Sequence, residues 1–214
     1  MIELNDNHKP ISATKEKIYL AAAKMFAEYG YDNVSMRDLA KEVGITNSSV
    51  YNHFSSKKDI RSGLFRYYTE QRKKYHPDLE RLLELAETEP PHKVLEIMEY
   101  HFPPDIEEFV HYILAIAAGG ISTDPECMQF IKDNVFAVSD ELTMPVLKRM
   151  AELGKIEPVD IESFNEILMH YCFSAVALNA TPMKIDFEKW QKGLKFLFSF
   201  LTPKVQTGKR VNRC

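Results

Sequence analysis

Between Ser35 and Phe54 the chain reads SMRDLAKEVGITNSSVYNHF. Ser35 and Asp38 have the spacing of a capping box, in which the serine hydroxyl accepts from a helix amide and the carboxylate accepts from the serine amide. Apolar side chains then recur at helical spacing as far as Gly44, a residue type that commonly ends a helix. A second helix is expected to open shortly afterwards, among polar N-cap residues. The stretch therefore predicts a helix-turn-helix.

Helical spacing continues on both sides of this stretch. Upstream, an apolar stripe predicts a helix that ends at Gly30. Downstream, Ser56 and Asp59 repeat the capping-box spacing, and their helix is expected to reach about Tyr75. Short turns join these four helices, so residues 11–74 are expected to form one small bundle. The core stripes of the first, second and fourth helices are Ile18, Ala22, Met25, Phe26 and Tyr29; Met36, Leu39, Ala40 and Val43; and Ile60, Leu64 and Tyr68.

The charge of the chain is unevenly distributed. The net charge is −4, yet residues 11–74 hold 12 Lys and Arg against 7 Asp and Glu, a net charge of +5. Residues 75–214 hold 14 Lys and Arg against 22 Asp and Glu, a net charge of −8. Such an asymmetry favours a polyanionic partner for the first part and a different role for the second.

Length and composition exclude several classes of protein. With 214 residues, 45% of them hydrophobic, the chain can bury a substantial core. The chain has only 8 glycines, and this small number disfavours a hairpin-rich β-fold or a glycine-rich phosphate loop. The longest apolar run, 113–118, is far too short for a membrane span, and the polar start lacks the plan of a secretion signal. Three scattered cysteines are too few for a disulfide framework, which predicts a cytoplasmic protein.

Polar side chains dominate the second helix of the helix-turn-helix. Val50 and Phe54 can anchor it, which leaves its amide, hydroxyl and imidazole groups without a packing role. Groups of this size can hydrogen-bond to base edges in a major groove, and nearby basic side chains can contact phosphates. Ordinary helical bundles also contain short capped helices, so a purely structural reading stays open. The candidates for base edges are Asn47, Ser48, Ser49, Asn52 and His53, and those for phosphates are Lys15, Lys17, Arg37, Lys57 and Lys58.

The rest of the chain is also predicted to be helical, with prolines and glycines at the breaks. The pattern from Asp124 to Leu153 contains Pro145, which predicts a kink. The predicted fold class is therefore all-α, with about nine to ten helices. We expect an N-terminal three-helix DNA-binding domain of the helix-turn-helix type over 11–60, a larger helical domain over 61–203, for which the family resemblance given below implies ligand binding and dimerisation, and a disordered tail over 204–214.

The last two predicted helices each carry two apolar faces. One face of each follows a regular spacing of three and four residues, and a second face lies beside it. A helix that is apolar on two sides must bury both, so one side is expected to pack on its own domain and the other on a partner chain. The alternative is that both faces lie inside one subunit. The predicted dimer interface comprises Phe164, Leu168, Tyr171, Ala175, Leu178, Trp190, Leu194, Leu197 and Leu201.

Residues 14–60 resemble the N-terminal DNA-binding domain of TetR-type transcriptional regulators. The most specific feature is a tyrosine, a phenylalanine and a lysine at intervals of three, here Tyr51, Phe54 and Lys57. The other matching segments are Ala21-Ala22, Phe26, Gly30-Tyr31, Asp38-Leu39-Ala40, Val43-Gly44-Ile45 and the run from Tyr51 to Ile60.

The resemblance implies roles for individual residues. Tyr51, His53 and Lys57 would occupy phosphate-contacting positions, with the polar residues before them nearer the bases. This chain departs from the family at Asn47-Ser48, where members often carry a basic residue or proline followed by glycine, so the operator sequence stays open. The full set of candidate DNA contacts is Lys15, Ser35, Arg37, Thr46, Asn47, Ser48, Ser49, Tyr51, Asn52, His53 and Lys57.

The resemblance also implies a homodimer built from the last two helices and a pocket for a small-molecule effector among the middle helices. Aromatic and methionine residues at helical spacing are more often plain core, so each pocket candidate has that second interpretation. The candidates are Tyr100, His101, Phe102, Phe109, Tyr112, Met128, Phe130 and His170.

No motif indicates catalysis, a metal or another cofactor. The histidines at 92, 101, 111 and 170 lack a recognised ligand spacing, and we find no nucleophile elbow, phosphate loop or HExxH sequence. Cys127 and Cys172 lie in apolar patterns, where an inert buried thiol is expected rather than a redox sensor.

These patterns favour a DNA-binding transcriptional regulator, a ligand-responsive repressor that binds a palindromic operator as a homodimer. Two other classes stay open: a helical small-molecule-binding enzyme or carrier, and a nucleoid-binding protein that acts through a protein partner. The sequence leaves the effector and the sign of regulation undecided.

Overall fold

The computed structural model describes residues 5–6, 9–98, 102–157, 160–179, 186–199 and 201. In this part the chain is helical apart from β1 (Asn5–Asp6) and β2 (Lys9–Pro10), a short antiparallel pair ahead of the first helix. The all-α fold class is thereby confirmed. None of the helices in this part is long and apolar enough to cross a membrane.

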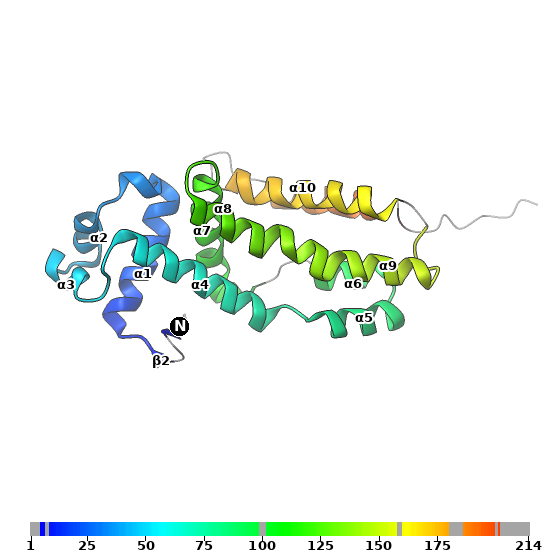
Figure 1. Cartoon of the computed structure of the whole chain (residues 1–214), viewed down its shortest axis with the longest axis horizontal. Helices are drawn as coiled ribbons and strands as arrows, with labels where there is room; N and C mark the ends of the chain where they lie inside the picture. Colours follow the sequence, from blue (N-terminus) through cyan, green and yellow to red (C-terminus); the bar gives the residue numbers. More distant parts are fainter. Residues whose placement is uncertain are drawn as a thin grey trace, which may run out of the picture.

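The first four helices, α1 to α4, lie at the N-terminal end of the molecule and are together called the head. Figure 1 shows α1 to α3 gathered at one end of the elongated chain, with α4 leading from them toward α5. A serine or threonine hydroxyl caps the start of each helix by accepting a backbone amide, as the sequence predicts for the second and fourth. The bounds are α1 (Ala13–Tyr29), a 3₁₀ turn (Tyr31–Asn33), α2 (Met36–Val43), α3 (Asn47–Tyr51) and α4 (Lys57–Tyr75).

One predicted capping box is confirmed and the other is incomplete. The Ser35 amide donates to Asp38 at 2.8 Å and the Asp38 amide donates back to the Ser35 hydroxyl at 3.2 Å. The Asp59 amide likewise donates to Ser56 at 3.1 Å, but its carboxylate accepts from the Ser55 amide at 2.9 Å instead of the Ser56 amide. The second prediction was therefore wrong in one of its two bonds, because the carboxylate reaches one residue further back.

The stripes predicted for the head form its core, with one exception. Ile18, Leu39 and Leu64 are fully buried. Tyr29, predicted to join the stripe of α1, is 60% exposed. It is the last residue of the helix, so its side chain extends past the packed turns.

Helices α1 and α4 approach closely at Gly63. A methyl group at this position would overlap the Tyr19 hydroxyl and lie 2.7 Å from the ring carbon Cζ. We expect Gly63→Ala to lower the free energy of unfolding by about 1–3 kcal/mol through overpacking, measured by denaturant unfolding. Gly119→Ala is the matched control, because that helical glycine has open space around it and alanine there should add up to about 1 kcal/mol. Equal stability of the two variants would contradict the close approach.

The remaining helices form the body of the molecule. Figure 1 shows α9 and α10 running along its long axis. One core joins the head to α7 and α8, where the rings of Tyr67 and Phe109 meet edge to face at 5.2 Å. A second core packs α5 and α6 against α9. The bounds are α5 (Leu79–Thr88), α6 (Pro91–Met98), α7 (Pro104–Gly120), α8 (Pro125–Ile131), α9 (Met144–Glu152), α10 (Ile161–Asn179) and α11 (Phe187–Ser199).

Two π-helical turns precede Pro145, and the kink predicted there stays a prediction. These turns span Lys132–Phe136 and Ser139–Thr143, and Pro145 sits in the first turn of α9.

The domain boundaries stay a prediction. The boundary expected after residue 60 falls inside α4, which belongs to the head at its start and to the body further on. The tail expected over 204–214 lies outside the described residues.

Candidate nucleic-acid interface

A left-handed glycine sets the angle between α2 and α3. Gly44 has φ +74° and ψ 34°, a backbone conformation that favours glycine, and the Ile45 amide donates to the Ala40 carbonyl at 2.9 Å. Thr46 then caps α3 by accepting the Ser49 amide at 3.2 Å. The predicted helix-turn-helix is therefore present, with its turn held at both ends.

Two apolar side chains anchor α3 to the head. Val50 and Phe54 are buried, as the sequence predicts, and the Phe54 ring meets Tyr19 edge to face at 4.8 Å. The Lys15 ammonium lies 5.2 Å from the centre of the same ring. A five-residue helix is not stable by itself, so these contacts determine where its other face points.

The opposite face of α3 is polar and open to solvent. Asn47, Ser48 and Asn52 are exposed, and Tyr51 is 51% exposed. His53 and Ser49 are half-buried at the edge of this face. The structure thus brings most of the predicted base-contacting residues together on one surface, with Tyr51 beside them.

Hydroxyl groups at the start of α3 bond to one another. The Thr46 hydroxyl lies 2.9 Å from that of Ser48 and 2.7 Å from that of Ser49. The Ser35 hydroxyl is likewise used locally, since it donates to Asp38 at 2.5 Å and helps hold the pKa of that carboxyl below its usual range. Thr46, Ser49 and Ser35 therefore have structural roles here, whatever else they contact.

Some of the predicted phosphate-contacting side chains are exposed, and one is bonded to another part of the chain. Arg37, Lys17 and Lys58 are exposed around α3. Lys57 instead donates to the Tyr31 carbonyl at 2.6 Å and lies 4.2 Å from the centre of the Tyr31 ring. Burial lowers the pKa of its ammonium group. In this structure Lys57 holds α4 to the α1–α2 connection and does not face outward, which corrects the expected role.

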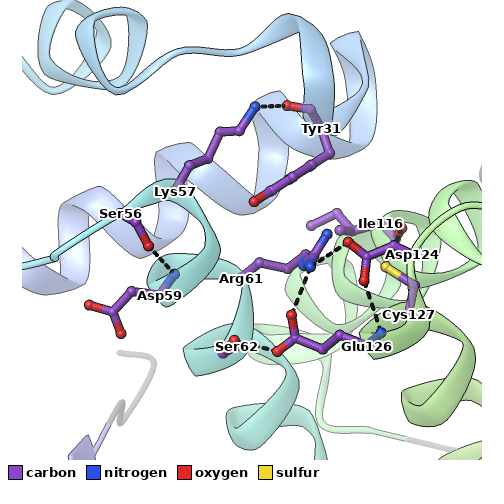
Figure 2. Close-up of polar contacts among 10 residues, drawn as sticks. All are labelled: Tyr31, Ser56, Lys57, Asp59, Arg61, Ser62, Ile116, Asp124, Glu126 and Cys127. Atoms are coloured by element: carbon purple, nitrogen blue, oxygen red, sulfur yellow. Dashed lines mark hydrogen bonds and ion pairs between the residues drawn. The ribbon is translucent and has the colours of Figure 1, made fainter.

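A buried arginine that the sequence reasoning missed lies beside this contact. Arg61 is 2% exposed and its Nη2 lies 2.7 Å from both Asp124 Oδ2 and Glu126 Oε2, at the start of α8 (Figure 2). A signal was available, because residues 61, 65 and 68 form a helical stripe in which Arg61 takes a core position next to Phe65 and Tyr68.

Four of the predicted pocket residues lie in or against one hydrophobic core, and two others are exposed. Phe102, Phe109 and Phe130 are buried core, packed against aromatic side chains of α4. Tyr112 is half-buried and donates to Glu108 at 2.7 Å, which raises its pKa to about 12. Met128 and His170 are exposed, so their assignment to an interior pocket is wrong: both lie on outward helix faces. Tyr100 and His101 lie outside the described residues.

Part of the predicted dimer seam lies inside the subunit. Leu168, Leu194 and Leu201 are buried within the chain, which corrects their assignment to a partner interface. Three other members make contacts inside the chain: the Tyr171 hydroxyl donates to the Trp190 carbonyl at 2.9 Å, and Phe164 packs against the second core. Ala175, Leu178 and Leu197 are half-buried. Regular spacing identifies an apolar stripe, but not which neighbour covers it.

Two large apolar side chains of these helices are exposed instead. Ile167 on α10 is 56% exposed and Phe196 on α11 is 62% exposed. Both belong to the second faces that the sequence analysis noted beside the seams. Both side chains therefore lie on the surface of the described part of α10 and α11.

The described residues contain no group of three or more histidine, cysteine or acidic side chains placed to hold a metal. Cys127 is buried, and burial raises the pKa of its thiol to about 11. A thiol in this state is a poor nucleophile at neutral pH.

Comparisons with known proteins point to one family. Residues 18–64 match the family described as bacterial regulatory proteins, tetR family. Over 46 residues the chain is 48% identical to the biofilm operon icaADBC HTH-type negative transcriptional regulator IcaR of Staphylococcus aureus (strain Newman). This match spans 22% of the chain and only 25% of that regulator.

Solved structures show the same fold over most of the chain. The TetR family transcriptional regulator PfmR from Thermus thermophilus has a TM-score of 0.65 at 22% identity, over 91% of this chain and 100% of that one. A gamma-butyrolactone receptor (ArpA like protein) has a TM-score of 0.63 at 14% identity, over 89% of this chain and 88% of that one.

Proposed function

We propose that this chain is a TetR-type regulator, a ligand-responsive transcriptional repressor that binds a palindromic operator as a homodimer. The observation that carries the proposal is the outward polar face of α3, held on a head of net positive charge by Val50 and Phe54. The similarity to IcaR, a negative transcriptional regulator, covers this same part of the chain and favours repression.

In this proposal α3 lies in the major groove of double-stranded DNA. The exposed amides of Asn47 and Asn52 can each donate and accept at a base edge, and the small Ser48 side chain lets the helix approach closely. The Tyr51 hydroxyl contacts a phosphate at the rim of the groove, as do Arg37, Lys17 and Lys58.

A helix of five residues reaches few base pairs, so specific binding calls for two copies on neighbouring half-sites. The exposed apolar side chains Ile167 and Phe196 support a contact between α10 and α11 of two chains. This contact replaces the predicted seam as the proposed dimer interface, with the half-buried Ala175, Leu178 and Leu197 at its edges.

The double substitution Ile167→Asp/Phe196→Asp is expected to convert the dimer to a monomer, because it places two charges from each chain in an apolar interface. Sedimentation velocity measures the change. Met128→Asp is the matched control, since Met128 is an exposed apolar residue of α8 that has no part in the proposed contact. A double variant that sediments like the unaltered protein would contradict the interface.

The effector would be a small molecule bound in the body. A solved structure with this fold is a gamma-butyrolactone receptor, which supports a ligand-binding role for the helical domain. The candidates for lining such a site are Phe102, which lies just before α7, and Phe109 and Tyr112, which lie on α7; all three are in or against the core that α4 and α7 share. A ligand that binds one arrangement of the head more tightly than another shifts the protein toward the first arrangement. The affinity for the operator then changes by the ratio of the ligand's two affinities, typically 5- to 150-fold.

The experiment that tests DNA binding is a salt titration. The chain is incubated with a pool of random duplexes, the enriched sequence is recovered, and its affinity is measured from 50 to 200 mM salt. We expect an enriched inverted repeat whose affinity falls steeply, by about 10³- to 10⁵-fold for 6–10 neutralised phosphates. Absence of salt-dependent binding would favour the enzyme or carrier class, and binding without an enriched sequence would favour a nucleoid protein.

A further inference from the structure

We propose that Arg61 is a positioning residue that fixes the angle of the head on the body, and thereby the separation of the two α3 helices in the dimer. The head-to-body part of this inference is independent of DNA binding, whereas its consequence for half-site spacing rests on the proposed function. Together with Asp124 and Glu126, Arg61 is called the clasp below.

The clasp joins elements that are far apart in the sequence. Arg61 lies near the start of α4, and its guanidinium bridges the two carboxylates through a single nitrogen, 2.7 Å from each. Asp124 is the N-cap of α8 and accepts the Glu126 amide at 2.9 Å, so the backbone at the start of α8 orients the carboxylates. The neighbouring Ser62 hydroxyl also donates to Glu126.

On its other side the guanidinium faces the head. Its central carbon lies 4.4 Å from the centre of the Tyr31 ring, in the connection between α1 and α2. The Lys57 ammonium lies near the same ring and donates to the Tyr31 carbonyl at 2.6 Å. Figure 2 shows the resulting order: Lys57, Tyr31, Arg61 and then the two carboxylates of α8. The start of α8 is thus tied through Arg61 to the segment that leads into α2.

A polar contact of this kind specifies geometry more than it adds stability. Apolar residues of similar volume usually stabilise an interior as well as a buried ion pair does, because the pair loses its hydration. An apolar contact, however, tolerates small rotations of one helix on another. Arg61 Nη2 forms both ion pairs only where the two carboxylates lie within hydrogen-bonding distance, which restricts α4 to one position on α8.

Further along, the packing of α4 on α8 is mostly apolar. The rings of Phe65 and Phe130 stack at 4.3 Å, and the Thr69 hydroxyl donates to Asn134 at 3.0 Å beyond them. These contacts hold α4 against α8 without Arg61. Loss of the clasp is therefore expected to loosen the angle of the head while the chain stays folded.

The test measures the distance between head and body within one chain. Nitroxide labels are placed at Glu42→Cys on α2 and Lys148→Cys on α9, both exposed, with Cys172 and Cys214 changed to serine and the buried Cys127 retained. The labelled chain is mixed with excess unlabelled chain, and double electron–electron resonance gives the distance distribution. This readout does not depend on DNA or on dimer formation.

Three variants are compared. Arg61→Met removes the charge and keeps the length of the side chain. The triple variant Arg61→Met/Asp124→Asn/Glu126→Gln also removes the two carboxylates, so that no uncompensated charge remains. Arg81→Met is the matched control, because Arg81 pairs with Glu84 at 2.9 Å on the exposed surface of α5.

We expect the distance distribution of the triple variant to be at least twice as wide as that of the unaltered chain, with Arg81→Met unchanged. A folded triple variant with the original distribution would overturn the proposal. Failure of the triple variant to fold would also overturn it, because the clasp would then be needed for the fold itself. If Arg61→Met folds, a wider distance distribution supports the proposal and an unchanged one contradicts it, as for the triple variant.

A second readout concerns DNA. On inverted repeats whose half-sites are moved apart by one or two base pairs, the unaltered protein should lose at least tenfold in affinity and the triple variant less than threefold. If the unaltered protein binds no DNA, the proposed function fails, and the distance distribution still decides the role of Arg61.

Discussion

Tyr51→Ala is expected to weaken binding to every DNA sequence by about 10²- to 10⁴-fold. Tyr51 is 51% exposed on the outward edge of α3, where its hydroxyl can donate to a phosphate. A hydrogen bond to a charged group contributes about 1.5–3 kcal/mol, and a dimer on two half-sites loses it twice. Because each 1.4 kcal/mol corresponds to a tenfold change, the combined effect is large. Fluorescence anisotropy with the enriched duplex and with scrambled duplexes measures it.

The same variant should leave two other properties unchanged. Tyrosine is uncharged at neutral pH, so the slope of log affinity against log salt should not change. Stability should change by no more than about 0.5 kcal/mol, since the side chain is on the surface. Tyr29→Ala is the matched control, because Tyr29 is 60% exposed in the same head at the end of α1. Equal affinities of the two variants would remove Tyr51 from the interface.

Phe54→Ala is expected to lower the free energy of unfolding by about 3–5 kcal/mol and to abolish DNA binding. The Phe54 ring is buried between Tyr19 and the Lys15 ammonium, and with Val50 it is what fastens α3 to the head. Without it a five-residue helix lacks most of its support. Denaturant unfolding measures the loss of stability, and amide hydrogen exchange across α3 reports local unfolding.

Phe54→Leu separates packing from aromatic chemistry. Leucine fills much of the same space, so this variant should lose less stability and keep DNA binding. Protected α3 amides and unchanged DNA affinity in Phe54→Ala would show that α3 is held by other contacts, which would contradict the arrangement described here.

Local signals in the sequence predicted the helices and the helix-turn-helix of the head. The Ser35–Asp38 box, the left-handed Gly44 and the anchors Val50 and Phe54 all depend on residues a few positions apart, and the structure has each of them. Short helices whose caps, stripes and turns agree leave few alternative arrangements.

The parts that could not be predicted depend on distant partners. The sequence predicts that Lys57 contacts a phosphate, whereas in the structure its ammonium group donates to the Tyr31 carbonyl. Spacing reveals two apolar faces on α10, but only the packing of α10 on α7, α9 and α11 shows that Leu168 is inside and Ile167 outside. Arg61 pairs with carboxylates that lie more than sixty residues away in the sequence, so no local pattern could predict the contact.

The central claim is that two copies of α3 read neighbouring half-sites of one DNA duplex. Hydroxyl-radical footprinting of the full chain on the enriched duplex tests it most directly. We predict two protected segments on one face of the duplex, with centres about 34–36 Å apart, and no such pattern with Tyr51→Ala at the same concentration. A single protected segment, or uniform protection without a repeat, would contradict the claim.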